Sequence, residues 1–391
     1  MSISERKHFD KNTRIAIFTS INRGGTMQLT TEIYKQLKSL GYTVNCIIPD
    51  RATFSPEDIQ ANEVHLFERK LLNNRINALF GEFIEYNNDV KNIANYLISN
   101  NFSAIITTDT SSFSLRVIKY LKSINSCVFT VATVHDAAPH PAYNASFKSK
   151  YYYWSSNLYR KGCLASADCL LFLSFNNMEK FKKTYPDLND NLVCIPLGAH
   201  IPNVNALKPI EIDRISNGYY LFFGRLEKYK GLCGFLKAYN EYKDTKYDLV
   251  IAGNGVLTEE EQRLISTNER VLLIKRYISD EEMKWLFENS KASVLPYIEA
   301  SQSGIIPISY SYSKPVITSN IQGLTQFVLN GLTGFICESS EDYVIAMKRI
   351  EDEKNYESMS FEARNYYDNN LDWSNNLREA INQFNNINKK S

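Results

Sequence analysis

Short runs of aliphatic and β-branched residues alternate along the chain with segments whose apolar residues recur every three or four positions. After one such run at residues 15–19, Leu29, Ile33 and Leu37 recur at helical spacing, and Gly41 ends the helix. Strands that alternate with helices in this way predict parallel sheets with crossover connections. In the first half the predicted strands cover residues 15–19, 43–48, 104–107 and 127–134, and the predicted helices cover 29–40, 83–98 and 112–123.

The alternation breaks in a segment that contains Pro202 and Pro209 and shows no periodicity, and then it restarts. The sequence therefore predicts two doubly wound α/β domains joined by a linker. Open parallel sheets bind ligands at the carboxyl ends of their strands, so two domains facing each other would form a cleft lined by those loops. The predicted strands of the second half cover 219–223, 248–252, 271–274, 292–296, 315–318 and 334–337. The predicted divisions are a first domain at 1–197, a linker at 198–217, a second domain at 218–370 and a C-terminal helix in 371–391 that could pack on either domain.

Composition narrows the class of protein. The 391 residues are 44% hydrophobic, and 44 Lys and Arg face 43 Asp and Glu, so no excess charge favours nucleic acid as a partner. Residues 1–197 hold 22 basic and 17 acidic side chains, a mild positive excess. There is no run of about 18 apolar residues and the N-terminus is polar, so we expect a cytoplasmic protein. The seven cysteines form no Cys-x-x-Cys pair, which argues against a disulfide or zinc framework.

Two loops that follow predicted strands could bind an anion. The first contains Gly24 and Gly25, which permit close approach of the backbone, although an ordinary tight turn explains them equally well. The second is FFGRLEKYKG at 222–231, in which Arg225 and Lys230 could hold a diphosphate between them. Solvated cations near helix ends are common, so this loop also has an ordinary explanation.

Two more loops could contact a substrate. Ser303 is a predicted N-cap, so a helix beginning at Gly304 would leave first-turn amides free for an anion, although such a cap can also stand empty. His135 falls just past a predicted strand and could hydrogen-bond a sugar hydroxyl or transfer a proton, whereas a lone histidine is more often structural. No acidic D-x-D follows a predicted strand, so we expect no metal.

The aromatic and basic stretch FKSKYYYW at 147–154, followed by Arg160 and Lys161, has two interpretations. It could lie against an anionic membrane surface or form a buried helix with a charged rim. The positive excess of the first half slightly favours peripheral membrane contact.

With these loops in place, the chain resembles the family 4 retaining glycosyltransferases of the GT-B fold, which have two Rossmann-like domains and use a nucleotide-activated sugar. The first half resembles them loosely, through the Gly24-Gly25 loop, VHDAAPHP and CIPLGAH. The resemblance also implies that the C-terminal helix in 371–391 packs back on the first domain. The second half carries five strings in the family's order: FFGRLEKYKG, LVIAGNG, YISDEEMKWLF, LPYIEASQSGIIPISYSYSKPVI and NGLTGFI.

The resemblance assigns roles residue by residue. It implies that Arg225 and Lys230 clamp the donor diphosphate and that His135 lies near the transferred sugar, which makes these three the predicted catalytic residues. Gly25 would approach the donor phosphate from the other domain. The other predicted donor-binding residues are Gly24 beside it, Arg276, Tyr277 and Ile278 at the nucleotide base, Glu299, and Ser301, Gln302, Ser303, Gly304 and Ile305 at the distal phosphate.

The chain departs from the family at its pair of glutamates, which are usually eight residues apart. Counting back from Pro315 places Ala300 and Ile308 at those positions, with Glu299 one residue from the first. No acidic residue lies between 300 and 315. The SQSG string resembles a subset of the family that replaces the glutamate motif in this way.

The resemblance therefore implies a retaining, metal-independent transferase that moves a hexose-type sugar from a UDP- or GDP-linked donor to a glycan or lipid-linked acceptor. No cofactor besides the donor is expected, and bacterial surface polysaccharide synthesis is the expected setting. A non-catalytic nucleotide-sugar or glycan binding subunit is the alternative, because the glutamate pair is missing. A nicotinamide-dependent oxidoreductase is disfavoured, because the first strand lacks the glycine fingerprint.

Overall fold

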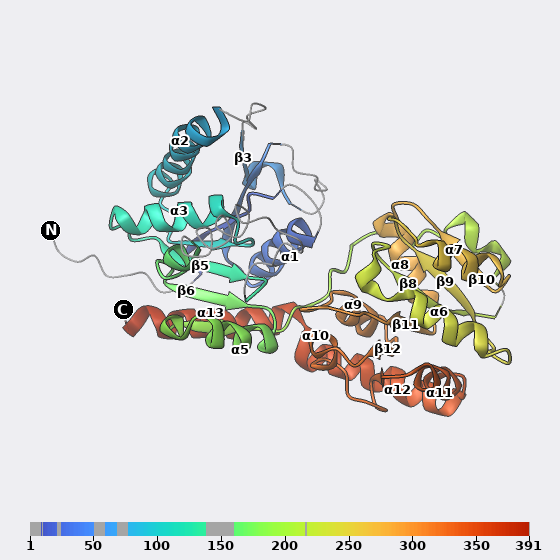
Figure 1. The fold of residues 1–391 in the computed structure, drawn as a ribbon. Coiled ribbons are helices and arrows are strands. Elements are labelled where there is room, and N and C mark those ends of the chain that lie inside the picture. The colour runs from blue at the N-terminus through green and yellow to red at the C-terminus, as the bar shows by residue number, and fades with distance from the viewer. Residues whose placement is uncertain are drawn as a thin grey trace. The chain divides into compact units, whose positions relative to one another are not determined.

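The fold is taken from a computed structural model of the 391-residue chain. It describes residues 9, 11–21, 25–50, 59–68, 77–137, 160–215 and 217–390. The chain forms two compact units, which consist of residues 1–196 with 373–391 and of residues 197–372 (Figure 1). Below they are called the first and the second unit.

The first unit contains a seven-stranded parallel sheet in the order β3-β2-β1-β4-β5-β6-β7. The strand order reverses at β1: β2 and β3 lie on one side of it, and β4 to β7 lie on the other. β1 and β4 pair from Ile15 with Ala104 to Phe18 with Thr107. Such a switch point leaves a crevice at the carboxyl ends of the two strands. The strands are β1 (Arg14–Phe18), β2 (Thr43–Pro49), β3 (Val64–Phe67), β4 (Ala104–Thr107), β5 (Phe129–Val134), β6 (Cys169–Phe172) and β7 (Leu192–Cys194).

The helices of the first unit include the last helix of the chain. α13 packs against α1 and β7, and Asn385 on α13 accepts a hydrogen bond from the backbone N–H of Phe9 at 2.7 Å. The ring of Phe9 contacts both Phe129 and Phe384, which joins the two ends of the chain to the sheet. The helices are α1 (Gly25–Ser39), α2 (Asn77–Ser99), α3 (Ser112–Ser123), α5 (Phe175–Thr184) and α13 (Trp373–Lys390).

Three strands of the first unit were not predicted from the sequence: β3, β6 and β7. Each has only three or four residues. β3 is also an edge strand whose Leu66 is 51% exposed, so its polarity does not resemble that of a buried strand.

The second unit contains a six-stranded parallel sheet in the order β10-β9-β8-β11-β12-β13. Side chains of β8 alternate between two hydrophobic clusters, with Tyr219 and Leu221 in one and Tyr220 and Phe222 in the other. The strand is therefore buried on both faces, as parallel sheets require. The strands are β8 (Tyr219–Phe223), β9 (Asp248–Ala252), β10 (Val271–Ile274), β11 (Ala292–Leu295), β12 (Val316–Ser319) and β13 (Gly334–Cys337).

Helices connect these strands, and three of them begin with a full capping box, at Thr258, Ser279 and Ser339. The α-helices of this unit are α6 (Leu232–Glu241), α7 (Glu259–Ser266), α8 (Asp280–Asn289), α9 (Ile305–Ser311), α10 (Gln322–Thr325), α11 (Ser340–Ile350) and α12 (Glu353–Tyr366). The predicted fold class of two Rossmann-like, parallel-sheet units is confirmed.

The segment 198–217, predicted as a linker, packs on the second unit. Ala199 and Ile212 are each 1% exposed and belong to its hydrophobic core. Ile212 lies in a short 3₁₀ helix, η3 (Ile210–Arg214), and the guanidinium of Arg214 donates to the carbonyl of Val271 at 2.7 Å. Two buried side chains, one before Pro202 and one after Pro209, give no periodic pattern, so the sequence alone did not reveal this packing.

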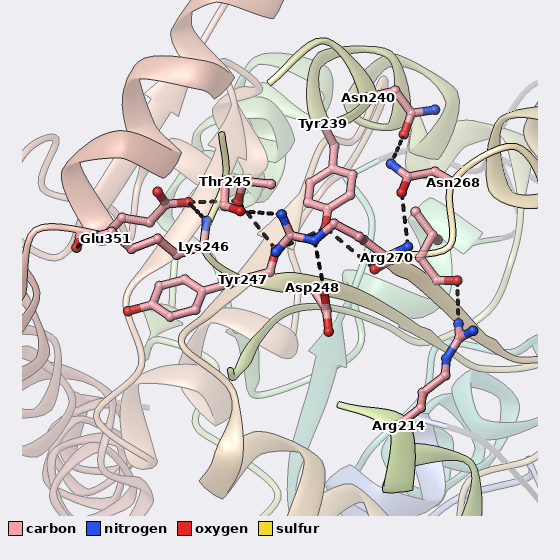
Figure 2. A network of polar contacts seen from close by, with 11 residues as sticks. Arg214, Tyr239, Asn240, Thr245, Lys246, Tyr247, Asp248, Asn268, Arg270 and Glu351 are labelled. Atoms are coloured by element: carbon pink, nitrogen blue, oxygen red, sulfur yellow. Dashed lines mark hydrogen bonds and ion pairs between the residues drawn. The ribbon is translucent and has the colours of Figure 1, made fainter. Parts of the chain in front are cut away.

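A network of polar side chains lies at the amino ends of β9 and β10 (Figure 2). The carboxylate of Glu351, 4% exposed, accepts hydrogen bonds from Tyr220, Tyr242 and Thr245 at 2.7–3.0 Å. Next to it, Arg270 pairs with Asp248. These charges have partners within the fold, so the network stabilises this edge of the sheet and leaves little charge free for a ligand.

Candidate functional site

The loops at the carboxyl ends of β8 and β9 touch backbone to backbone, and glycines make this possible. Gly253 has φ +152°, and a Cβ placed there would lie 1.9 Å from the carbonyl oxygen of Gly224. Gly231 has φ +63°, and its Cβ would lie 1.9 Å from the carbonyl oxygen of Pro296. The loop after β8 is thus held close to the loops after β9 and β11.

Lys230 lies at the end of a 3₁₀ turn, η4 (Lys228–Lys230), and its side chain is buried. The residue is 7% exposed, and its Nζ donates to the hydroxyl of Tyr297 at 2.9 Å and lies 4.7 Å from the centre of that ring. Burial lowers the pKa of the Lys230 ammonium. Among the described residues Nζ forms no ion pair, so this is a buried cation that lacks an anion.

Arg225 has the opposite environment. Its side chain is 73% exposed, and its guanidinium pairs with Glu227 at 2.8 Å. Glu227 is the acidic residue closest in sequence to Lys230, and it pairs with Arg225 instead. The exposed ion pair contributes little stability, so Arg225 can turn toward a ligand at small cost.

The loop after β11 supports Lys230 from the other side. Tyr297 is 4% exposed, and burial raises the pKa of its hydroxyl to about 12 although a bond to Ser303 lowers it. The Ser303 hydroxyl also accepts from the amide of Ile305 at 3.3 Å. Lys230, Tyr297 and Ser303 therefore form a continuous chain of contacts from the β8 loop to the start of α9.

The predicted start of α9 was wrong by one residue. The helix begins at Ile305 with Gly304 as its N-cap, instead of at Gly304 with Ser303 as the N-cap. Gly304 has no side chain to cap the helix, so the Ser303 hydroxyl caps the Ile305 amide from one position earlier. The other predicted residues of this turn differ in environment: Glu299 is exposed, Ser301 is half-buried, and Oε1 of Gln302 is buried with no hydrogen-bond partner among the described residues.

The predicted base-binding segment 276–278 is braced by an arginine between two glutamates. Arg276 makes two bonds of 2.9 Å to Glu211 and two of 2.7 Å to Glu282. These bonds lower the pKa of both carboxyl groups and raise that of Arg276. The Arg276 side chain is therefore committed to the fold, whereas Tyr277 is 79% exposed and Ile278 is buried.

His135 and Gly25 lie in the first unit. The Nε2 atom of His135 lies 2.8 Å from the carbonyl oxygen of Thr108, at the carboxyl end of β4. Gly25 begins α1, and a Cβ there would meet no atom of the described residues within 4 Å. Gly24 and the aromatic stretch 147–154 lie outside the described residues. Of the cations after that stretch, Arg160 donates to the carbonyl of Asp136, and Lys161 pairs with Asp187.

Asp109, which was not predicted as a site residue from the sequence, joins the loops after β1 and β4 at the switch point. It is 2% exposed and accepts hydrogen bonds from the amides of Ser20 and Ser111, both at 2.8 Å. The hydroxyls of Thr19 and Ser114 donate to it as well. A signal was present, because an acidic residue among Ser and Thr directly follows the buried strand at 104–107.

The described residues contain neither a membrane-spanning helix nor a group of metal ligands. No helix there is long and apolar enough to cross a membrane. No three or more His, Cys, Asp or Glu side chains are grouped there in a way that could hold a metal ion.

Known proteins share a sequence pattern with most of the second unit and share the fold of the chain. Residues 214–369, most of the second unit, match the family described as Glycosyl transferases group 1. Two solved structures share the fold: a glycosyltransferase of Rickettsia africae, at 20% identity and TM-score 0.69 over 97% of this chain and 100% of that one, and HepE of Anabaena in complex with UDP and glucose, at 14% identity and TM-score 0.70 over 95% and 100%. The chain therefore has the GT-B fold of these glycosyltransferases.

A curated relative is similar over part of the chain. A stretch of 157 residues is 27% identical to the capsular polysaccharide biosynthesis glycosyltransferase CapM of Staphylococcus aureus. The match covers 38% of this chain and 40% of CapM. The match to the group 1 family, at residues 214–369, lies within the second unit.

Proposed function

We propose that this protein is a glycosyltransferase that takes a sugar from a nucleotide-sugar donor, and that the donor diphosphate binds at Lys230 and Arg225. The observation that carries the proposal is the Lys230 ammonium, which is buried at the carboxyl end of β8 with a tyrosine hydroxyl as its partner. A buried cation without an anion is costly, and a bound phosphate would supply that anion.

The two cations suit different parts of this task. Lys230 is fixed by Tyr297 and can act as a preorganised charge that needs no reorganisation when the substrate binds. Arg225 is exposed and can leave Glu227 for a phosphate with which it makes two parallel hydrogen bonds. Negative charge grows on the diphosphate as it departs from the sugar, so both cations would bind the transition state more tightly than the ground state.

We further propose a retaining reaction of family 4 type that needs no metal, because the two cations can neutralise the leaving group themselves. The acceptor hydroxyl would attack from the face that the nucleotide leaves, and the acceptor would be a glycan or lipid-linked glycan. The similarity of part of the chain to CapM supports polysaccharide synthesis as the setting. UDP is the first donor nucleotide to test, because HepE of Anabaena has been solved with UDP and glucose. Peripheral contact with the inner membrane face stays a prediction.

Thermal unfolding in the presence of UDP-, GDP- and ADP-linked sugars tests donor binding. We expect one nucleotide to raise the melting temperature well above the others, since binding to the folded state alone stabilises it. Slow hydrolysis of the matching donor, followed by NMR of the released sugar, then reports whether the anomeric configuration is retained. A protein that binds a donor but never cleaves it would instead be the non-catalytic subunit, and a protein that binds none would refute the proposal.

A further inference from the structure

The loop that carries His135 is held by a side chain from a distant part of the chain, Asn177 on α5. Asn177 is 5% exposed, and its Oδ1 accepts from the amide of Ala137 at 2.8 Å. Its Nδ2 donates to the carbonyl of His135 at 2.5 Å and to that of Val134 at 3.4 Å. One buried amide group therefore fixes the backbone before, at and after His135.

The imidazole of His135 is held as well. Its Nε2 lies 2.8 Å from the carbonyl oxygen of Thr108, and a carbonyl can only accept, so Nε2 carries the hydrogen. In the neutral ring this leaves Nδ1 as an acceptor, and no described residue bonds to it. Thr108 is itself anchored, because its hydroxyl and that of Thr30 lie 2.6 Å apart.

Arg160 completes the support of this loop. Its guanidinium donates to the carbonyl of Asp136 at 2.7 Å, next to the carbonyl of His135 that Asn177 binds. Consecutive carbonyls are thus bound by two side chains from different parts of the chain. Such bracing of both the backbone and the ring determines the direction in which Nδ1 points.

We propose that Asn177 is a positioning residue for His135. By fixing the backbone of residues 134–137, it keeps Nε2 of His135 on the Thr108 carbonyl and presents Nδ1 as an acceptor for a sugar hydroxyl. This inference rests on the proposed function, since that function supplies the sugar.

Kinetics of donor cleavage test the inference through a double-mutant cycle. Asn177→Ala should lower kcat roughly tenfold to a hundredfold, because a small displacement of a reacting group has an effect of this order. In a His135→Ala background the same change should alter kcat by no more than about twofold, since Asn177 acts through His135. Thr130→Val is the matched control, because Thr130 lies in β5, the strand that precedes His135. The substitution removes the hydrogen bonds between the buried Thr130 hydroxyl and Asp168, and it should leave kcat near the wild-type value.

Asn177→Asp covers the case in which the alanine variant does not fold. It retains an oxygen for the Ala137 amide but cannot donate to the carbonyls of Val134 and His135, so it should also lower kcat. Equal losses of kcat in the wild-type and His135→Ala backgrounds would show a general structural role and overturn the proposal.

The ¹⁵N spectrum of the imidazole gives a readout that needs no activity. We expect His135, assigned by comparison with His135→Ala, to show the Nε2–H tautomer in the wild type and in Thr130→Val. In the Asn177 variants the pure Nε2–H signature should be lost, and an unchanged spectrum would overturn the proposal. If the wild type cleaves no donor, the proposed function fails, and this spectrum still decides whether Asn177 positions His135.

Discussion

Replacing Lys230 with methionine should weaken nucleotide binding and leave the empty protein at least as stable as the wild type. Methionine has a similar length and no charge, so it can lie on the ring of Tyr297 without a desolvation penalty. A lysine that merely filled the core would behave differently, because its loss would leave the affinity for nucleotides unchanged. Weaker nucleotide binding together with equal or higher stability is expected only if the Lys230 ammonium serves to bind a ligand.

The expected changes in nucleotide affinity and in stability follow from the surroundings of Lys230. A charge-assisted hydrogen bond is worth about 1.5–3 kcal/mol, so loss of Lys230 should raise the Kd for UDP about tenfold to a hundredfold. In the empty protein the variant avoids the desolvation of an ammonium, a penalty of several kcal/mol, and loses one charge-assisted hydrogen bond worth about 1.5–3 kcal/mol. The Tyr297 hydroxyl keeps its bond to Ser303. The net gain in the free energy of unfolding should therefore lie between zero and about 2 kcal/mol.

Titration calorimetry with UDP and urea unfolding of the empty protein measure the two quantities. Lys228→Met is the control, because it removes an exposed lysine with the same charge from the same turn. It should change neither the Kd nor the stability appreciably. A Lys230→Met variant that is less stable and binds UDP as the wild type does would refute the assignment of Lys230 to a ligand.

Three further predictions concern stability and are measured by urea unfolding. Gly231→Ala should destabilise the protein by more than about 2 kcal/mol, since the added Cβ would meet the backbone of Pro296 at φ +63°. Gly234→Ala is the control, because it lies in a helix with space for a Cβ and should stabilise the protein by about 0.5–1 kcal/mol. Similar effects of the two substitutions would contradict the close approach at Gly231. Burial, with help from Lys291, lowers the pKa of Lys314 to about 8, so the folded state loses a proton that the unfolded chain keeps, and stability should rise with pH from about 8 to about 10. Lys314→Met should remove this rise and add up to about 3 kcal/mol at pH 7, and an unchanged pH profile would show that Lys314 is not its source. Arg276→Lys should lower stability by about 1 kcal/mol, because one ammonium cannot bind two carboxylates with paired bonds, and equal stability would show that the brace on 276–278 is dispensable.

The strand and helix pattern of the second unit could be predicted because it is local. The strands at 219–223, 248–252 and 271–274 have the predicted bounds, since each consists almost entirely of apolar residues and has turn residues at its ends. The position of Arg225 and Lys230 after the first of these strands followed from the same pattern. Residue spacing along the chain also gave the two-unit, parallel-sheet class, because alternation of strands and helices leaves few other arrangements.

The environments of the candidate residues depended on contacts between distant parts of the chain. Nothing near Lys230 in the sequence indicates that its ammonium lies against Tyr297, 67 positions away, while Arg225 stays exposed. Arg276 finds Glu211 across 65 positions, and Asn177 reaches the carbonyl of His135 across 42. Hydrophobic periodicity records which face of an element is buried, whereas the pairing of polar groups is decided by which elements the sheet order places side by side. The sequence by itself determined most of the elements and the kinds of side chain at their ends, and the tertiary structure decided which of those side chains are buried, paired or left for a ligand.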